Sequence, residues 1–383
     1  MVKMKVLIVA GARPNLMKIA PLIKEMARQG DFMPILVHTG QHYDVRMSGQ
    51  FFADLEIPPP DVSLEVGSGS HAVQTSEVMK RLEPVLERER PDAVLVVGDV
   101  NSTVAAALTA VKMRIPVAHV EAGLRSFDRT MPEEINRLVT DVISDWLFVT
   151  EESGVANLRA EGVPDEKVFL VGNVMIDCLE ASRRAWQRSS IHGRLGVTKG
   201  RYGVVTLHRP SNVDDPMILS AVLGALGHVA QQLPLIFPVH PRTRGKLEML
   251  SEKPANLFTQ ATPVERAGIF CVEPLGYLDF MALVSGARII LTDSGGIQEE
   301  TTALGIPCVT LRENTERPIT VTHGTNRIVG ISPSAIVEEG RRILSAAAPP
   351  PLPPPLWDGH AAERIVSQLR ECLKSRGMNA AAR

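Results

Sequence analysis

Charged and polar side chains follow directly on several short apolar segments of this 383-residue sequence, which are predicted to be strands. Residues 11–18, GARPNLMK, follow KMKVLIVA, Asp99 follows AVLVVG, Glu121 ends the run PVAHVE, and His208 ends YGVVTLH. A strand fixes the position of such a side chain, while the loop that follows keeps it accessible to a ligand. These residues are therefore the first candidates for chemistry.

Two of these candidates are carboxylates. Glu121 lies at the tip of an apolar strand, where burial disfavours the charged carboxyl unless a cation or hydrogen bond compensates, and that combination suits a general acid or base. The alternative is a structural ion pair with Arg125. Asp99 is the second carboxylate. It either serves the site or caps the next helix, for which residues 101–103 (Asn-Ser-Thr) are also suited.

A further acidic pair occurs in the segment PEEINR. Its pattern places Glu133 and Glu134 in the first turn of a helix, where carboxylates complement the helix dipole. Taken alone, the segment leaves a catalytic role and a purely stabilising role open.

Basic side chains accompany the acidic ones. Pro14 suits the first turn of a helix, so Arg13 would sit just before the helix N-terminus and Lys18 about one turn in. Both can reach an anion near free backbone N–H groups, or they are ordinary surface cations. His208 can transfer a proton near neutral pH or bind phosphate when charged, and its alternative is a structural role.

The segment IILTDSGGIQEE is the strongest single motif. Ser294, Gly295 and Gly296 form a tight turn whose glycines let backbone amides approach a ligand at the start of a helix, which predicts a pyrophosphate cradle. Glu300 lies about one helical turn further on and is placed to receive ribose hydroxyls, and Arg317 adds positive charge. No GxxxxGK[ST] or GxGxxG motif is present, so neither a Walker-type ATPase nor an NAD-binding protein is supported.

The elements that position these residues follow an α/β pattern. Short runs rich in Val and Ile alternate with longer stretches of helical period, as in βαβ units that form a parallel sheet. The pattern restarts near residues 173–200, so we expect domains at 1–175 and 176–360, and a last helix at 361–383 packing back on the first domain. Two such domains imply a cleft, with ligands outside the carboxyl ends of the strands. The proline-rich stretch at 346–360 is interpreted as a stiff spacer, with an SH3-type ligand as the alternative.

Composition limits the function classes. Forty-one Lys and Arg against 43 Asp and Glu give a formal net charge of −2, which predicts no nucleic-acid or membrane partner. The apolar runs are strand-sized and the N-terminus lacks the order of a signal peptide, so we expect a cytoplasmic protein. The four cysteines have no metal-ligand spacing, so we expect reduced core thiols and no metal site.

Taken together, these segments resemble the non-hydrolysing UDP-N-acetylglucosamine 2-epimerases, which have the GT-B fold. The resemblance runs from GARPNLMKIAPL through GDVNST, HVEAGLRS, MPEEINR, VGN, TLHRP, PVHPRT and LTDSGGIQEE to TERP, over roughly residues 4 to 330. It implies two Rossmann-like domains facing a central cleft, and a reversible inversion at C2 of a UDP-linked 2-acetamido sugar without a cofactor. UDP would be eliminated to leave 2-acetamidoglucal and then added back.

The resemblance also implies roles for individual residues. The catalytic set carried over comprises Lys18, Asp99, Glu121, Glu133 and His208. The UDP-sugar would be bound by Arg13, Lys18, His208, His240, Phe280, Ser294, Gly295, Gly296, Glu300 and Arg317, with Phe280 stacking on uracil. A homodimer is implied as well. Which of the three carboxylates takes the C2 proton stays open.

The sequence departs from the family pattern in two places. Position 15 is Asn where an acidic residue is common, and the segment QHYDVRMSGQ near Gln41 differs from the form linked to an allosteric UDP-sugar site. A diacetamido or uronic acid sugar is therefore an alternative substrate. A GT-B glycosyltransferase, a hydrolysing epimerase and a non-catalytic nucleotide-sugar sensor also stay open, although plain sugar transfer would not require the set of three carboxylates.

Overall fold

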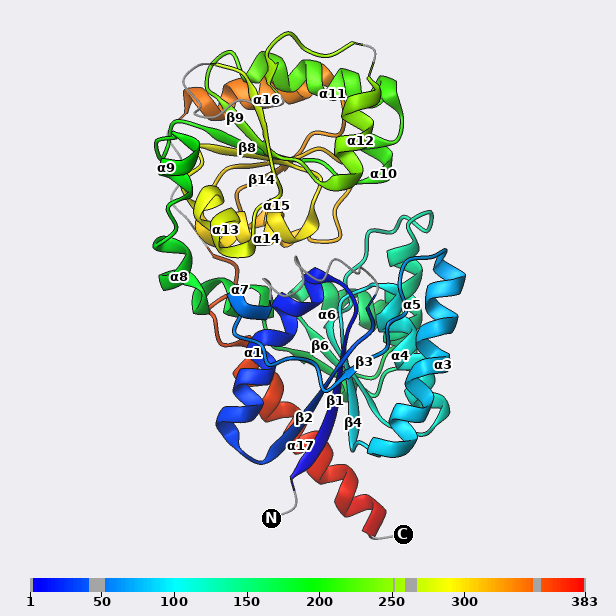
Figure 1. Ribbon diagram of the computed structural model, residues 1–383. Coiled ribbons are helices and arrows are strands. Elements are labelled where there is room, and N and C mark those ends of the chain that lie inside the picture. Colours follow the sequence, from blue (N-terminus) through cyan, green and yellow to red (C-terminus); the bar gives the residue numbers. More distant parts are fainter. Residues whose placement is uncertain (1–2, 41–51, 251, 259–266, 347–352, 382–383) are drawn as a thin grey trace. The chain divides into compact units, whose positions relative to one another are not determined.

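The computed structural model describes residues 3–40, 52–250, 252–258, 267–346 and 353–381 (Figure 1). The chain divides into two compact units, unit 1 formed by Met1–Ala181 with Pro355–Arg383 and unit 2 formed by Ser182–Pro354. Each unit contains a seven-stranded sheet in which neighbouring strands run parallel. The expected α/β class is confirmed.

The sheet of unit 1 has the strand order β3-β2-β1-β4-β5-β6-β7. The strands are β1 (Met4–Ala10), β2 (Phe32–His38), β3 (Val62–Ser63), β4 (Ala93–Val97), β5 (Val117–Ala122), β6 (Trp146–Val149) and β7 (Val168–Leu170). Because β1 lies between β2 and β4, the connections turn to opposite sides after β1 and after β4. Such a switch point leaves a crevice for ligands at the carboxyl ends of the strands.

Helices cover both faces of this sheet (Figure 1). They are α1 (Arg13–Gln29), α3 (His71–Glu89), α4 (Asn101–Lys112), α5 (Pro132–Ile143), α6 (Glu152–Ala160), α7 (Val174–Ala181) and α17 (Ala361–Ala381), with a 3-10 turn at Asp165–Lys167. As expected, α1 has Pro14 in its first turn and ends at Gly30, whose φ of 78° is left-handed. Helix α1 packs against α7 and α17, whereas α4 packs against both α3 and α5.

Unit 2 repeats the arrangement with the order β10-β11-β9-β8-β12-β13-β14. Its strands are β8 (Gly203–Thr206), β9 (Leu235–Pro238), β10 (Leu257–Phe258), β11 (Ile269–Val272), β12 (Ile289–Thr292), β13 (Cys308–Thr310) and β14 (Asn326–Ile328). Its helices are α8 (Arg183–Gln187), α9 (Ile191–Leu195), α10 (Pro210–Val213), α11 (Pro216–Val229), α12 (Pro241–Met249), α13 (Tyr277–Ser285), α14 (Gly295–Leu304), α15 (Ile319–Thr322) and α16 (Pro333–Ser345). Here the switch point lies between β8 and β12. His208 follows the end of β8, and Ser294 follows the end of β12.

The last helix completes unit 1. Asp177 of α7 accepts hydrogen bonds from the backbone amides of Ala361 and Ala362 at the start of α17, at 3.1 and 2.6 Å. Nearer its end, Arg370 pairs with Asp31 at 2.7 Å. Cys178, Cys271 and Cys308 are buried in the core, as expected, whereas Cys372 is only partly buried, and no two of the four are joined.

Candidate functional site

A buried ion pair joins α1 to β5 in unit 1. Lys18 Nζ lies 2.6 Å from Glu121 Oε2, and the two residues are 5% and 3% exposed. The backbone of Glu121 has a φ of 73°, and the β5–β6 register shifts between Val120 and Ala122. A bulge of this kind re-aims a side chain. Lys18 and Glu121, separate candidates in the sequence, are thus in direct contact.

The alternative pairing of Glu121 with Arg125 is wrong. Arg125 instead contacts Asp141 and Glu161, each at 2.7 Å. Two carboxylates therefore neutralise Arg125, and Lys18 supplies the positive charge beside Glu121.

The turn after β4 is built closely around Lys18. Gly98 has a φ of 66°, and a Cβ at this position would lie 2.8 Å from Lys18 Nζ. Asn15 accepts hydrogen bonds from the amides of Gly11 and Ala12, at 3.1 and 3.0 Å, and donates from Nδ2 to the Val97 carbonyl at 3.1 Å. A carboxylate at position 15 could accept the amides but could not donate to Val97. Asn15 therefore ties the ends of β1 and β4 together, a role that the sequence did not indicate.

Asp99 is held by Arg137, whose Nη1 donates to Asp99 Oδ2. Arg137 is 2% exposed and also pairs with Glu134 at 2.6 Å. The sequence reasoning missed Arg137, although it lies one helical turn after Glu133 and Glu134. The arginine fixes the Asp99 carboxylate and leaves it partly accessible, with 22% of its side chain exposed.

The two acidic residues at the start of α5 differ in environment. Glu134 is buried and accepts hydrogen bonds from the amides of Ser126 and Phe127, at 3.0 and 2.9 Å, as well as from Arg137. Burial alone would raise the pKa of Glu134, but these bonds hold it below its ordinary value. Glu133 is half-buried. Glu134 thus organises the loop before α5, and Glu133 is the more accessible carboxylate.

Asn101, Ser102 and Thr103 do not cap α4 as expected. The N-cap position is Val100, and no side chain there bonds to the helix amides. Asn101 instead donates to Gln74 at 2.8 Å, Ser102 bonds to Thr39 at 2.8 Å, and Thr103 donates to the Val97 carbonyl at 2.9 Å. These side chains join neighbouring segments because the helix starts one residue earlier than a capping role would require.

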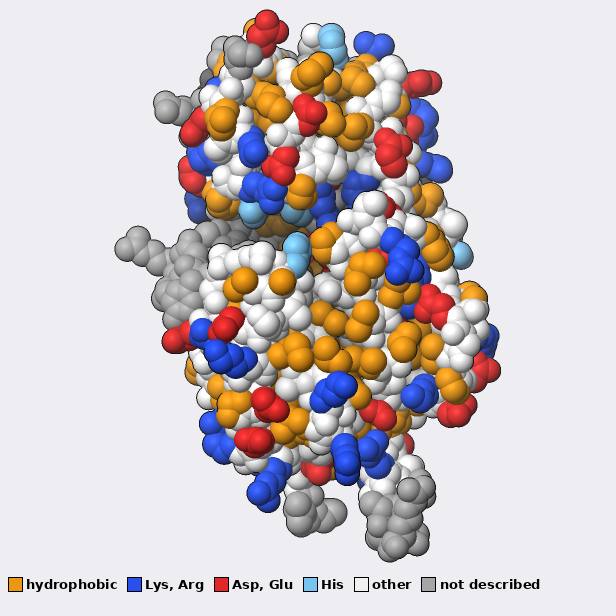
Figure 2. All heavy atoms as spheres, turned by 90° about the vertical axis from the view of Figure 1, so that its right-hand side faces the viewer, with side chains coloured by type: hydrophobic (Ala, Val, Ile, Leu, Met, Phe, Trp, Pro, Cys, Tyr) orange, Lys and Arg blue, Asp and Glu red, His pale blue; other side chains and the backbone are white. Residues whose placement is uncertain are grey.

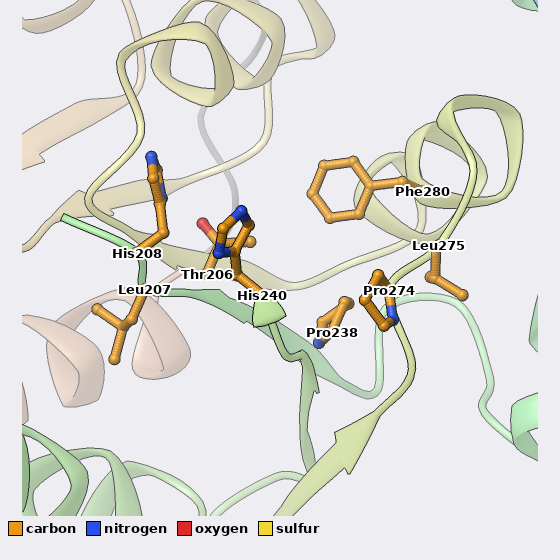
Figure 3. A pocket seen from close by; sticks show the side chains of 8 residues that line it. All are labelled: Thr206, Leu207, His208, Pro238, His240, Pro274, Leu275 and Phe280. Atoms are coloured by element: carbon orange, nitrogen blue, oxygen red, sulfur yellow. The ribbon is translucent and has the colours of Figure 1, made fainter. Parts of the chain in front are cut away.

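In unit 2, a pocket of about 160 Å³ lies at the carboxyl ends of β8 and β9 (Figure 3). Three predicted UDP-binding residues line it, His208, His240 and Phe280. The rings of His208 and His240 are 6.0 Å apart, and Phe280 of α13 lies across the pocket from them (Figure 3). The remaining lining is mostly apolar, so the pocket offers a ring face beside two imidazoles.

Asp293 orients His208. His208 Nδ1 lies 2.9 Å from Asp293 Oδ1, and the other carboxylate oxygen accepts the amides of His208 and Arg209, each at 2.9 Å. Burial would raise the pKa of Asp293, but the bonds from His208 and Arg209 keep it below its ordinary value. With Nδ1 on the carboxylate, Nε2 is left for a ligand. The sequence reasoning passed over Asp293, although it directly follows β12 and precedes the Ser294 turn.

The Ser294 turn opens α14. Ser294 is the N-cap residue and makes no side-chain bond to the helix, while its amide donates to Thr292 Oγ1 at 2.9 Å. A Cβ on Gly295 would lie 2.6 Å from Arg317 Nη1, so only glycine lets this arginine approach the turn. Gly296 follows in the first turn of the helix.

The charged residues behind this turn are buried and paired. Arg317 contacts Glu299 at 2.9 Å and Glu316 at 2.5 Å, so two carboxylates offset its charge. Glu300 is only 3% exposed, and burial together with the neighbouring Glu299 raises its pKa to about 8. A neutral Glu300 can donate as well as accept a hydrogen bond.

Other predicted features have simpler outcomes. Arg13 is the first residue of α1, but its side chain lies outside the described part, as does the segment around Gln41. Within the residues that the structure describes, no group of His, Cys, Asp and Glu has the arrangement of a metal site. None of the described helices combines the length and apolar character that a bilayer crossing requires.

Comparison with known proteins defines first the class and then the family. The fold is GT-B-like, since a glycosyltransferase of kitacinnamycin with only 15% identity superposes with a TM-score of 0.56 over 100% of this chain and 98% of its own. Residues 24–370 match the family UDP-N-acetylglucosamine 2-epimerase. The chain belongs to this family of isomerases.

Individual relatives are similar over nearly their whole length. The UDP-N-acetylglucosamine 2-epimerase of Methanocaldococcus jannaschii is 40% identical over 95% of this chain and 98% of its own. A crystal structure of the enzyme from that organism in complex with UDP-GlcNAc and UDP aligns with a TM-score of 0.86 at 38% identity, over 96% of this chain and all of the other. The UDP-2,3-diacetamido-2,3-dideoxy-D-glucuronate 2-epimerase of Pseudomonas aeruginosa is also 40% identical, over 89% and 92% of the two chains.

Proposed function

We propose that this protein interconverts UDP-N-acetylglucosamine and UDP-N-acetylmannosamine by elimination and re-addition of UDP. The observation that carries the proposal is the buried contact between Lys18 and Glu121 at the carboxyl end of β5. An epimerisation at C2 needs a fixed carboxylate to move a proton, and a nearby cation keeps that carboxylate charged when it is buried.

In the elimination, a carboxylate of unit 1 takes the proton from C2. The C1–O bond to the diphosphate breaks and its electron pair leaves with UDP, which gives 2-acetamidoglucal. In the reverse step, a proton is delivered to the opposite face of C2 while a diphosphate oxygen attacks C1. Asp99, Glu121 and Glu133 are the proton-transfer candidates, and the assignment of each step among them stays open.

Unit 2 supplies the groups for UDP. Phe280 offers a face for uracil in the pocket that it shares with His208 and His240. His208, oriented by Asp293, and the open start of α14 at Ser294, Gly295 and Gly296 would bind the diphosphate, with Arg317 and Glu300 behind the turn. Arg13 and Lys18 would add positive charge as the leaving group departs. No cofactor or metal is required by this chemistry.

A diacetamido uronic acid is the second candidate substrate. The Pseudomonas aeruginosa relative, named for that sugar, is as similar in sequence as the Methanocaldococcus jannaschii enzyme. Both substrates undergo the same inversion at C2, so the two proposals differ only in the sugar that is accepted.

The proposed reaction is tested by incubating the purified protein with UDP-N-acetylglucosamine in deuterated water. The expected product is UDP-N-acetylmannosamine with deuterium at C2, seen by NMR. Free N-acetylmannosamine with UDP would instead identify a hydrolysing epimerase. Tight UDP binding without turnover would favour the diacetamido uronic acid, tested next, or a sensor.

A homodimer is part of the proposal. Ile135, Val139 and Val142 are spaced to lie on one side of α5, and they are 37%, 37% and 70% exposed. Hydrophobic side chains gather on the face of unit 1 seen in Figure 2, the side on which α3 and α5 lie in Figure 1. Such an apolar stripe suits a second copy of the chain. Val142→Lys should shift the sedimentation coefficient to that of a monomer, and a wild-type monomer would contradict the proposal.

A further inference from the structure

His119 is a fully buried histidine two residues before Glu121 in β5. Its Nδ1 lies 2.7 Å from Asp141 Oδ1, and its Nε2 lies 2.8 Å from the carbonyl oxygen of Gly98. Both neighbours are oxygen atoms on groups that ordinarily accept hydrogen bonds.

The partners determine where the protons are. A carbonyl oxygen can only accept, so Nε2 must carry a hydrogen. The other oxygen of Asp141 accepts from the Gly123 amide at 3.0 Å and from Arg125 Nη1 at 2.7 Å, as an ionised carboxylate would. Burial acts to raise the pKa of Asp141, but His119 and Arg125 lower it below its ordinary value. An ionised Asp141 leaves Nδ1 as the donor, so both ring nitrogens are protonated.

The hydrogen bond to the Gly98 carbonyl connects His119 with the candidate catalytic residues. The Gly98 amide donates to the Val120 carbonyl at 3.0 Å, and the missing side chain of Gly98 leaves room for Lys18 Nζ. Lys18 in turn contacts Glu121. A shift of the Gly98 peptide would therefore move Asp99, the next residue, and disturb the packing around Lys18.

We infer that His119 is a positioning residue, a buried imidazolium that holds the Gly98 carbonyl and thereby sets the relative positions of Lys18, Asp99 and Glu121. The inference rests on the proposed function, for which it supplies the support beneath the proton-transfer groups. His119 touches no reacting atom in this scheme.

The charges around His119 favour this state. Asp141 faces it from α5, and Arg125, from the loop after β5, lies on the far side of that carboxylate and pairs with Glu161 from the end of α6. On the other side of Gly98 are Lys18 and Glu121, which pair with each other. The cluster of His119, Asp141, Arg125 and Glu161 holds two cations and two anions, so a neutral imidazole would leave it with an unbalanced negative charge.

The protonation state is tested on the wild-type protein. In ¹⁵N-labelled protein at pH 8, both ring nitrogens of His119 should show the chemical shift of a protonated imidazolium and a bound hydrogen. An ordinary histidine, with a pKa near ~6.5, would be mostly neutral there. A His119 ring with one unprotonated nitrogen would overturn the inference.

Two matched substitutions test the positioning role. In His119→Gln, the amide nitrogen falls near Nε2 and can still donate to Gly98. In His119→Asn, it falls near Nδ1 and keeps only the bond to Asp141. His119→Asn should lower kcat by about 10- to 100-fold with KM within about threefold, whereas His119→Gln should retain most of the activity. His228→Asn is the control.

The possible outcomes test the positioning role of His119 separately from its protonation state. Equal activity of both His119 variants and the wild type, or greater loss in His119→Gln, would overturn the positioning role. If a variant fails to fold, as judged by its thermal unfolding, the ¹⁵N spectrum of the wild-type protein decides whether the inference about His119 holds. If the wild-type protein does not turn over any UDP-sugar, the proposed function fails, and the inference about His119 is judged on the NMR result alone.

Discussion

The ammonium group of Lys18 lies 2.6 Å from the carboxylate of Glu121, and almost no solvent reaches either side chain. Lys18 comes from the second turn of α1, and Glu121 comes from a bulge at the end of β5. The interaction depends on both charges being present, because an unpaired charge in this environment is strongly unfavourable.

Removing the cation should therefore affect both stability and rate. Lys18→Met is expected to lower the free energy of unfolding by about 3–5 kcal/mol and to lower kcat by at least about 100-fold. The exposed pair between Lys24 and Glu56 gives a matched control, since Lys24→Met should cost less than about 1 kcal/mol. Urea unfolding and steady-state rates measure the two effects. Similar losses in the two variants would contradict the assignment.

Neutralising the carboxylate should separate chemistry from binding. Glu121→Gln is expected to reduce turnover by about 100-fold or more while the affinity for UDP, held by unit 2, changes little. Isothermal titration with UDP and the deuterium exchange at C2 provide the two readings. An equal loss of UDP affinity would mean that Glu121 is structural.

The neighbouring acids at the start of α5 should respond in opposite ways. Glu134→Gln removes an acceptor of buried amide and guanidinium bonds, so we expect a loss of about 1–3 kcal/mol in stability. Glu133→Gln should leave the unfolding midpoint nearly unchanged and lower kcat. The two substitutions serve as controls for each other, and the reverse order would show that the roles are exchanged.

Glu300 makes stability depend on pH. Its pKa is about 8 in the folded protein, against about 4.3 for an unfolded chain. The folded state thus holds a proton that the unfolded state releases. The contribution of Glu300 to stability is therefore complete below pH ~4.3 and falls by about 1.4 kcal/mol per pH unit as the pH rises toward 8. Glu300→Gln should abolish this fall. Urea midpoints between pH 5 and 8 test it, with the exposed Glu338→Gln as the control, and parallel curves for Glu300→Gln and the wild type would refute it.

Much of the fold was predictable because it depends on local patterns. Alternating Val- and Ile-rich segments predicted the parallel sheets, and Pro14 and Gly30 marked the bounds of α1. The candidate residues at strand ends came from the same rule, which placed Lys18 and Glu121 near the same edge of one sheet. Their direct contact depends on the bulge in β5, for which the sequence carries no clear signal.

The wrong predictions of side-chain partners share a physical cause. A buried polar or charged side chain bonds to groups that are near it in space, and these are often far from it in the sequence. Arg125 lies near Glu121 in the chain but bonds to residues 16 and 36 positions further along, Asp141 and Glu161. Asn101, Ser102 and Thr103 had the composition of a helix cap, yet neighbouring segments offered them different partners. Side-chain partners of this kind cannot be read from spacing alone.

The return of the chain to unit 1 after Pro354 bears on biosynthesis. During translation, the whole of unit 2 is synthesised before Ala361–Ala381. Asp177 and Asp31 therefore lack their partners in this helix until synthesis of the chain is nearly finished. The nascent first unit is thus incomplete for more than 170 codons, the length of Ser182–Pro354. Premature termination in that interval would leave Phe32, over which Arg370 lies, without this cover.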